Sequence, residues 1–207
     1  NNHNTEPGYD TDFVLIVENT GSITDTFDIG VKSNDGGFVI TIEEGYESII
    51  VGKDKMKPII INVKTSASAT GLLYAHLEVR SQGDTSQKVG VRLDVNTDHT
   101  FGNLSSVGNS VSVHYAGILA NNARLFDTSM ESVWDSYKLS GHYSQLGDTP
   151  VTDNNRHITT LSADNIGCDS PSTHEDCDGS RGMIPGFDAK MVGMYEGQTL
   201  VVRIPAK

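Results

Sequence analysis

The sequence predicts a mainly β protein of two domains, the first of which is an immunoglobulin-like β-sandwich. Apolar and polar residues alternate from Asp12 to Asn96, as they do in antiparallel strands with one face in water. Turns rich in glycine and asparagine separate seven such runs, a number and spacing typical of that sandwich. A polar stretch without periodicity follows, from Thr97 to Ser110. It indicates a domain boundary.

The seven predicted strands are short, and most of them show their period directly. In residues 88–96 (KVGVRLDVN) one face carries the apolar set, and His76 falls on the outward face of its own strand. The other predicted strands are 12–17, 26–31, 38–42 (FVITI), 47–51 (ESIIV), 58–64 (PIIINVK) and 73–80 (LYAHLEVR). The predicted inward residues include Phe27, Ile29, Val31, Ile59, Ile61, Val63, Leu73, Ala75, Leu77, Val79, Val89, Val91, Leu93 and Val95.

The composition excludes some partners. The 207 residues are 36% hydrophobic, with a formal net charge of −12 and a pI of about 4.8. Without a basic stripe, phosphate neutralisation cannot supply binding energy, so we expect neither a nucleic acid nor an anionic membrane as partner. No segment approaches the ~18 to 20 apolar residues of a membrane span, and no signal peptide is present. Because the first residue is Asn1, we expect a processed or trimmed chain.

Two cysteines bear on the compartment. Cys168 and Cys177 flank the polar loop CDSPSTHEDC, and their spacing suits a local disulfide, although two free surface thiols would also fit. A disulfide favours an oxidising compartment, so we expect an extracellular or cell-surface protein. Asn103 begins the sequon Asn-Leu-Ser, a glycosylation candidate that a single chance match would equally produce.

The first domain also resembles a known module. The phrases VENTGSITDTFDIGV and LEVRSQGD…VGVRLDVN, within residues 10–97, resemble CARDB-type immunoglobulin-like modules of secreted and surface proteins. That resemblance implies a spacer or an adhesive unit. It implies no catalytic residue.

The second half contains a short predicted helix. Pro185 suits a first helical position because its φ is already helical, and Asp188 faces the positive end of the helix dipole. Ile184, Phe187, Met191 and Met194 recur on one helical face. The pattern alone predicts packing in a core.

This half resembles the FKBP-type peptidyl-prolyl isomerase domain. The resemblance lies in VHYAGIL…LFDTS and MIPGFDAKMVGMYEGQTLVVRIPAK, and it covers residues 108–129 and 182–207. It implies an α+β domain in which a curved antiparallel sheet packs on a short helix. The expected organisation is a sandwich over 1–99, a linker over 100–109 and an FKBP-like domain over 110–207 with an insertion at 130–181.

The resemblance further implies a substrate pocket for a proline-containing polypeptide, with no cofactor and no metal. Prolyl isomerisation needs only an apolar pocket and a few hydrogen bonds that hold the twisted amide. The implied catalytic residues are Tyr115, Phe126, Asp127, Ile184 and Phe187, with Met183 as a further substrate contact. Without the resemblance, Tyr115 and Phe126 would be interpreted as core aromatics.

Two departures from the family weaken that implication. The sequence stops at Lys207, before the family's closing strand, so either it is a fragment, which we favour, or a second chain supplies the strand by pairing. The insertion carries Trp134, Tyr137 and Tyr143, which could cover the pocket, bind a partner or pack among themselves. Trp134 is therefore a candidate substrate contact.

The acidic residues beside the cysteines form a weak calcium candidate, because oxygen-rich loops can hold this ion. Solvated carboxylates are the simpler interpretation. The residues are Asp169, Glu175, Asp176 and Asp178.

The leading functional expectation is a peptidyl-prolyl isomerase or folding chaperone. The alternative is a non-catalytic structural or adhesive surface protein, such as a filament subunit, that reuses an FKBP-like fold.

Overall fold

A computed structural model describes residues 2–141, 161–168 and 185–204. The chain divides into two compact units, and each is described by itself. The first contains residues 1–103 and 195–201, and the second contains residues 104–194 and 202–207. The mainly β prediction is confirmed, since the described residues form twelve strands and two helices. In the described ranges, no helix is both long and apolar enough to cross a bilayer.

The first unit is built from eight strands. The seven predicted strands are all present, each within a few residues of its predicted bounds. A short strand near the N-terminus, whose sequence Asn-His-Asn carries no apolar alternation, adds to them. The strands are β1 (Asn2–Asn4), β2 (Asp10–Asn19), β3 (Asp25–Asn34), β4 (Phe38–Ile42), β5 (Ser48–Val51), β6 (Lys55–Thr65), β7 (Leu72–Ser81) and β8 (Lys88–Asn96).

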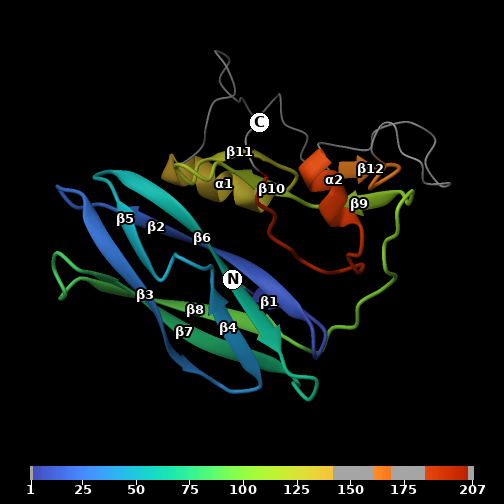
Figure 1. Ribbon diagram of the computed structural model, residues 1–207, viewed down its shortest axis with the longest axis horizontal. Helices are drawn as coiled ribbons and strands as arrows, with labels where there is room; N and C mark the ends of the chain where they lie inside the picture. Colours follow the sequence, from blue (N-terminus) through green and yellow to red (C-terminus); the bar gives the residue numbers. More distant parts are fainter. Residues whose placement is uncertain (1, 142–160, 169–184, 205–207) are drawn as a thin grey trace, which may run out of the picture. The chain divides into compact units, whose positions relative to one another are not determined.

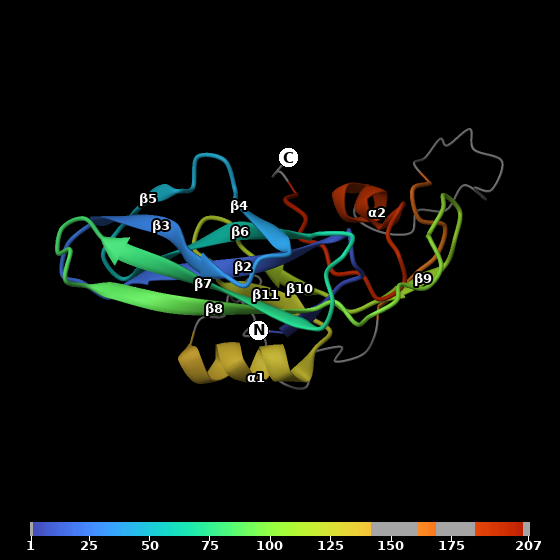
Figure 2. The same ribbon diagram turned by 90° about the horizontal axis from the view of Figure 1, so that it is seen from below.

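These strands form two sheets that face one another (Figures 1 and 2). One sheet has the order β1-β8-β7-β3-β5, and the other has the order β2-β6-β4. All neighbours are antiparallel except β1 and β8, which are parallel. Strands β4 and β5 each lie at the edge of their sheet, and the chain passes from the three-stranded sheet to the five-stranded sheet between them.

The core of the first unit lies between the sheets. Period-two alternation places the apolar side chains there, and the buried members are Phe13, Val17, Ile29, Phe38, Ile49, Val51, Ile59, Ile61, Val63, Ala75, Leu77, Leu93 and Val95. Two predicted inward residues are wrong, because Val31 is 41% exposed and Val89 is 64% exposed. The β3–β7 register shifts between Val31 and Ser33, and such a bulge turns the strand's side chains. Val89 lies near the start of β8, where the buried pattern has not yet begun.

The second unit holds shorter elements. They are β9 (Val111–Val113), β10 (Ala116–Ile118), β11 (Leu125–Thr128), α1 (Glu131–Ser140), β12 (Leu161–Ala163) and α2 (Pro185–Met191). The strands β10 and β11 form one two-stranded ladder, and β12 and β9 form another. The buried side chains of Ala163, Ile166 and Met191 form a small core, against which Phe187 and Met194 pack.

The predicted helix is present, but its predicted surroundings are not. Helix α2 begins at Pro185, and Met191 on its predicted inner face is 3% exposed. Asp188 is also buried, and it accepts the N–H of Gly167 at 2.8 Å. The described residues of this unit form two separate ladders of three or four residues per strand. The single curved sheet of an FKBP-like domain is not formed by them, and the arrangement of a sandwich plus an FKBP-like domain is not shown.

Candidate functional site

Three of the predicted pocket residues meet in the second unit. The Tyr115 hydroxyl donates a hydrogen bond to the Asp127 carboxylate at 2.5 Å. The Tyr115 ring meets Phe187 of α2 edge-to-face, with ring centroids 6.3 Å apart. Two hydrogen bonds hold the Tyr115 backbone to residues at the end of β11. Thr128 Oγ1 donates to the Tyr115 carbonyl at 2.7 Å, and the Tyr115 N–H donates to Ser129 Oγ at 2.8 Å.

The other predicted pocket residues do not complete a pocket among the described residues. Phe126 covers Gly117 so closely that a Cβ there would lie 2.4 Å from its ring, so this ring packs on the neighbouring strand. Trp134 on α1 is buried, with 4% of its surface exposed. Met183 and Ile184 lie outside the described residues.

The remaining sequence candidates are only partly described. Cys168 is 2% exposed, while its predicted partner Cys177 lies outside the described residues, so the disulfide stays a prediction. Asp169, Glu175, Asp176 and Asp178 lie outside them too. The described ranges contain no group of three or more potential metal ligands. Asn103 is exposed, which is compatible with a glycosylation site and does not test it.

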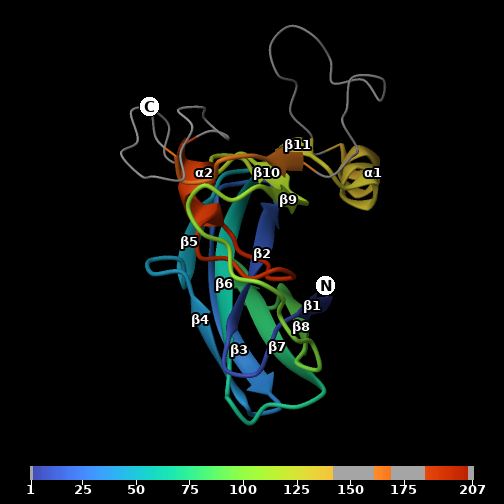
Figure 3. The same ribbon diagram turned by 90° about the vertical axis from the view of Figure 1, so that its right-hand side faces the viewer.

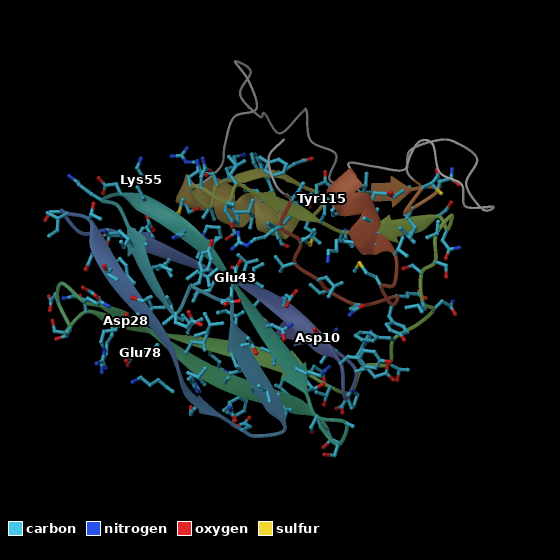
Figure 4. The ribbon with its side chains drawn as sticks, in the orientation of Figure 1. Asp10, Asp28, Glu43, Lys55, Glu78 and Tyr115 are labelled. Atoms are coloured by element: carbon cyan, nitrogen blue, oxygen red, sulfur yellow. The ribbon has the colours of Figure 1, made fainter. Side chains whose placement is uncertain are left out.

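A charged face on the first unit gathers three cations around one carboxylate. Glu78 on β7 receives Lys32 at 3.0 Å and Arg80 at 2.8 Å, and Lys88 lies 3.8 Å away. The Lys32 ammonium, followed by Arg80, lowers the pKa of Glu78. A shallow depression of about 220 Å³ lies beside this network, over Gly30 of β3. Figure 4 shows Asp28 and Glu78 together on this sheet. Because the three cations are largely exposed, each ion pair is screened by water and contributes little to stability.

The free edge of β4 offers a different chemistry. Two hydrogen bonds set which of its backbone groups face β6: Glu43 N–H donates to Ile60 O at 3.0 Å, and Ser66 N–H donates to Gly37 O at 2.6 Å. In an antiparallel ladder, alternate residues turn their N–H and C=O groups toward opposite sides. With the register Val39–Lys64 and Thr41–Asn62, these two residues bond β6. The backbone groups of Phe38, Ile40 and Ile42 therefore point outward from the sheet.

The outward backbone groups of β4 have no partner in the part of the chain that the structure describes. Across the described ranges, β4 pairs with β6 alone, and no other hydrogen bond reaches the N–H or C=O of Phe38, Ile40 or Ile42. Figure 3 shows β4 at the border of its sheet, with β6 on its inner side. The side chains of Val39, 66% exposed, and Thr41 face solvent, while Phe38 anchors the strand in the core at 7% exposure.

Both ends of this edge have a physical cause. At the start, Gly36 and Gly37 have φ values of 80° and 75°, which break the extended conformation and favour glycine. At the end, Glu43 turns its carboxylate to accept the Ile60 N–H at 3.2 Å, and Figure 4 places this residue beyond β4. Pro58 is the next residue of β6 whose backbone faces the β4 side, and proline has no N–H. The β4–β6 ladder therefore stops before Pro58. Because Pro58 lies beyond the end of this ladder, it removes no hydrogen bond from the sheet.

This edge is the best candidate for a functional surface in the described residues. Unpaired N–H and C=O groups on a regular strand form a template for another strand. The segment Phe38-Val-Ile-Thr-Ile42 is β-branched or aromatic throughout and lacks charge, proline and glycine, which strengthens that tendency. The alternating pattern of the sequence predicts this strand but not its free edge. The absence of any charge in FVITI, between Gly-Gly and Glu-Glu, is the signal that could have indicated it.

Comparison with known proteins gives weak structural similarity and no sequence match. No family model matches the chain, and no curated protein matches it. A PapD-like domain of human CEP192 aligns with 13% identity and a TM-score of 0.37, over 48% of this chain and 82% of that one. SSP-19, an MSP-domain-like protein of Caenorhabditis elegans, aligns with 15% identity and a TM-score of 0.32, over 45% and 92%. The CsuC–CsuE chaperone–adhesion subunit complex of Acinetobacter baumannii aligns with 8% identity and a TM-score of 0.32, over 61% and 67%.

The predicted FKBP relationship and isomerase activity are corrected, because no family model and no curated protein supports them. None of the three structures above carries a description as an isomerase. The physical reason lies in the second unit, where the matching segments form two short ladders and not one sheet around a pocket. The catalytic roles given to Tyr115, Phe126, Asp127, Ile184 and Phe187 depended on that relationship, as did the proline-containing partner.

Proposed function

We propose that this protein is a non-catalytic structural or adhesive protein of the cell surface or extracellular space, which binds extended polypeptide segments by strand addition at β4. One observation carries the proposal: the backbone groups of Phe38, Ile40 and Ile42 point outward from the sheet and, among the residues that the structure describes, have no strand partner. The chemistry of such a row is the recognition of another backbone. It needs no metal and no reactive side chain.

The build of the first unit supports this role. The edge strand is anchored in the continuous core of the sandwich through Phe38, while the side chains of Val39 and Thr41 are exposed to solvent. A rigid strand with fixed hydrogen-bonding groups loses little conformational entropy when a second strand binds. Strand addition would therefore leave the core unchanged.

Binding of a labelled strand peptide tests the proposal. The probe is an N-acetylated, C-amidated peptide with the sequence of residues 37–43, followed by fluorescence anisotropy as the full chain is titrated. We expect saturable binding to the wild-type chain and none to Ile40→Pro, because proline removes the central outward N–H and blocks approach of a strand. Ile40→Ala, which keeps that N–H, is the matched control and should still bind. Equal binding to the proline variant, or no binding to the wild type, contradicts the proposal.

A further inference from the structure

We propose that the strand that pairs with β4 is β4 of a second copy of this chain, in antiparallel register about Ile40. This inference rests on the proposed function and names its partner. A twofold interface requires one surface to be complementary to itself. The edge of β4 meets that requirement in its backbone, in its side chains and in its charge.

The backbone complementarity follows from which residues face outward. Phe38, Ile40 and Ile42 present their N–H and C=O groups at the free edge. A register that places Ile40 opposite Ile40 of the copy also places Phe38 opposite Ile42 of the copy. All these pairs then join outward-facing residues, so each pair can exchange two hydrogen bonds. A shift of one residue would oppose outward groups with groups already bonded to β6.

The charges support the same register. Position 43 of one copy then lies opposite position 37 of the other, so Glu43 faces Gly37, and Glu44 faces Gly36. Like charges directly opposite each other destabilise a ladder, and this register contains none. The side chains of Val39 and Thr41 lie opposite each other on the solvent face, where both strands are exposed.

The ends of the ladder also coincide. Gly36 and Gly37 leave the extended conformation at the position where Glu43 of the copy bonds its own β6 through the Glu43 N–H. Each copy therefore contributes the whole of β4 and no more. The other long edge of the same sheet, β2, carries Asp10, Asp12 and Glu18, so a copy pairing there would place carboxylates beside carboxylates.

The net charge of −12 on each copy predicts how this association responds to salt. Two anionic copies repel each other at low ionic strength, and added salt screens this repulsion. The β4 ladder itself is uncharged, so salt does not weaken it. We therefore expect the dimer dissociation constant to fall, by roughly tenfold, between about 0.01 and about 0.5 M salt, as the Debye length shrinks below about 10 Å. Analytical ultracentrifugation of the full chain measures this directly.

A register-specific cross-link tests the inference. Val39 and Thr41 of the copy form a non-hydrogen-bonded pair, for which the Cα separation of about 4.5 Å suits a disulfide. Diagonal positions are about 7 to 8 Å apart and suit it poorly. Val39→Cys and Thr41→Cys chains, mixed under mild oxidation, should give a covalent dimer with a 39–41 linkage by peptide mass spectrometry. Neither variant alone should give one.

Val39→Cys mixed with Val89→Cys is the matched control, because these positions are 66% and 64% exposed and only the first lies on β4. A dimer from Val39→Cys alone, or from the control mixture, would overturn the register. If the strand peptide binds while the chain stays monomeric by ultracentrifugation at every salt concentration, the partner is another polypeptide and this inference fails alone. If the peptide does not bind, the proposed function fails with it.

Discussion

The two edges of the three-stranded sheet differ in chemistry, although both belong to one sandwich. Strand β2 carries Asp10, Asp12 and Glu18, and Asp12 is engaged by side-chain and backbone donors, from Asn62 at 2.8 Å and Val201 at 3.0 Å. Strand β4 has no charged residue between Phe38 and Ile42. Charges on an edge discourage a second strand. One border of the sheet is therefore protected from strand addition, and the other is not.

The largest expected effects concern how firmly each edge is held in the core. Phe13 of β2 is 1% exposed and stacks on the His3 ring, with centroids 4.0 Å apart. We expect Phe13→Ala to reduce the free energy of unfolding by about 3–5 kcal/mol through the lost apolar contacts and the cavity. Phe38→Ala should cost less, because Phe38 lies at the end of β4. Urea unfolding measures both, and an unchanged midpoint for Phe38→Ala would show that β4 is not anchored.

The next effect separates the two sides of β4. Thr41→Pro removes an N–H that bonds β6 and leaves a carbonyl unpaired, so relative to Thr41→Ala we expect a loss of about 1–3 kcal/mol. Ile40→Pro removes an outward N–H, so relative to Ile40→Ala it should change stability by about 0.5 kcal/mol or less. The alanine variants correct for the side chains. Equal losses at both positions would contradict the assigned sides.

A smaller, pH-dependent effect is expected on the β2 side. His3 lies against Phe13 and within 3.3 Å of Thr11 Oγ1, and burial lowers the pKa of its imidazole. The unfolded chain then binds a proton more readily than the folded one. Stability is therefore complete above the unfolded pKa of about 6.5 and falls as the pH drops from there toward the folded pKa.

Denaturant unfolding between pH 7.5 and pH 5 tests the direction of this effect. In His3→Gln the part of the slope that comes from His3 should disappear, while Phe38→Ala in β4 should keep it. Stability that rises as the pH falls through this range, in the wild type but not in His3→Gln, would reverse the assigned sign.

The smallest effect on stability should accompany the largest effect on association. Val39→Lys and Val89→Lys change side chains of nearly equal exposure, so each should alter the free energy of unfolding by less than about 0.5 kcal/mol. Only Val39→Lys places a charge on the β4 edge, and only this variant should abolish peptide binding and dimerisation. Loss of both activities in Val89→Lys would show that net charge, and not the edge, governs association.

Much of the sandwich could be predicted from the sequence, because its strands alternate over one buried face. All seven predicted strands are present, and their apolar sets supply the core. The exceptions are local. Val31 precedes a bulge, and Val89 lies outside the buried part of β8. Strand β1 has no apolar pattern, and its pairing with β8 makes it a strand.

The candidate site could not be predicted to the same extent. A period-two pattern shows that FVITI is a strand, but it does not show which strand lies next to it. Only the register of β4 against β6 reveals which N–H and C=O groups face outward. In the second unit, the motif around Phe187 predicted a helix that is present. The resemblance carried by the motifs around Tyr115 and Phe187 predicted a family and an activity that are wrong.

Residue-resolved amide exchange in the monomer distinguishes the paired side of β4 from its free side. In dilute, low-salt solution we expect a period-two pattern along β4, followed by NMR: slow exchange at Val39 and Thr41, which bond β6, and fast exchange at Phe38, Ile40 and Ile42. Adding the residue 37–43 peptide should slow the fast set alone. Uniform slow exchange along β4 in the monomer would mean that its outer edge is already paired, and the account of this surface would be wrong.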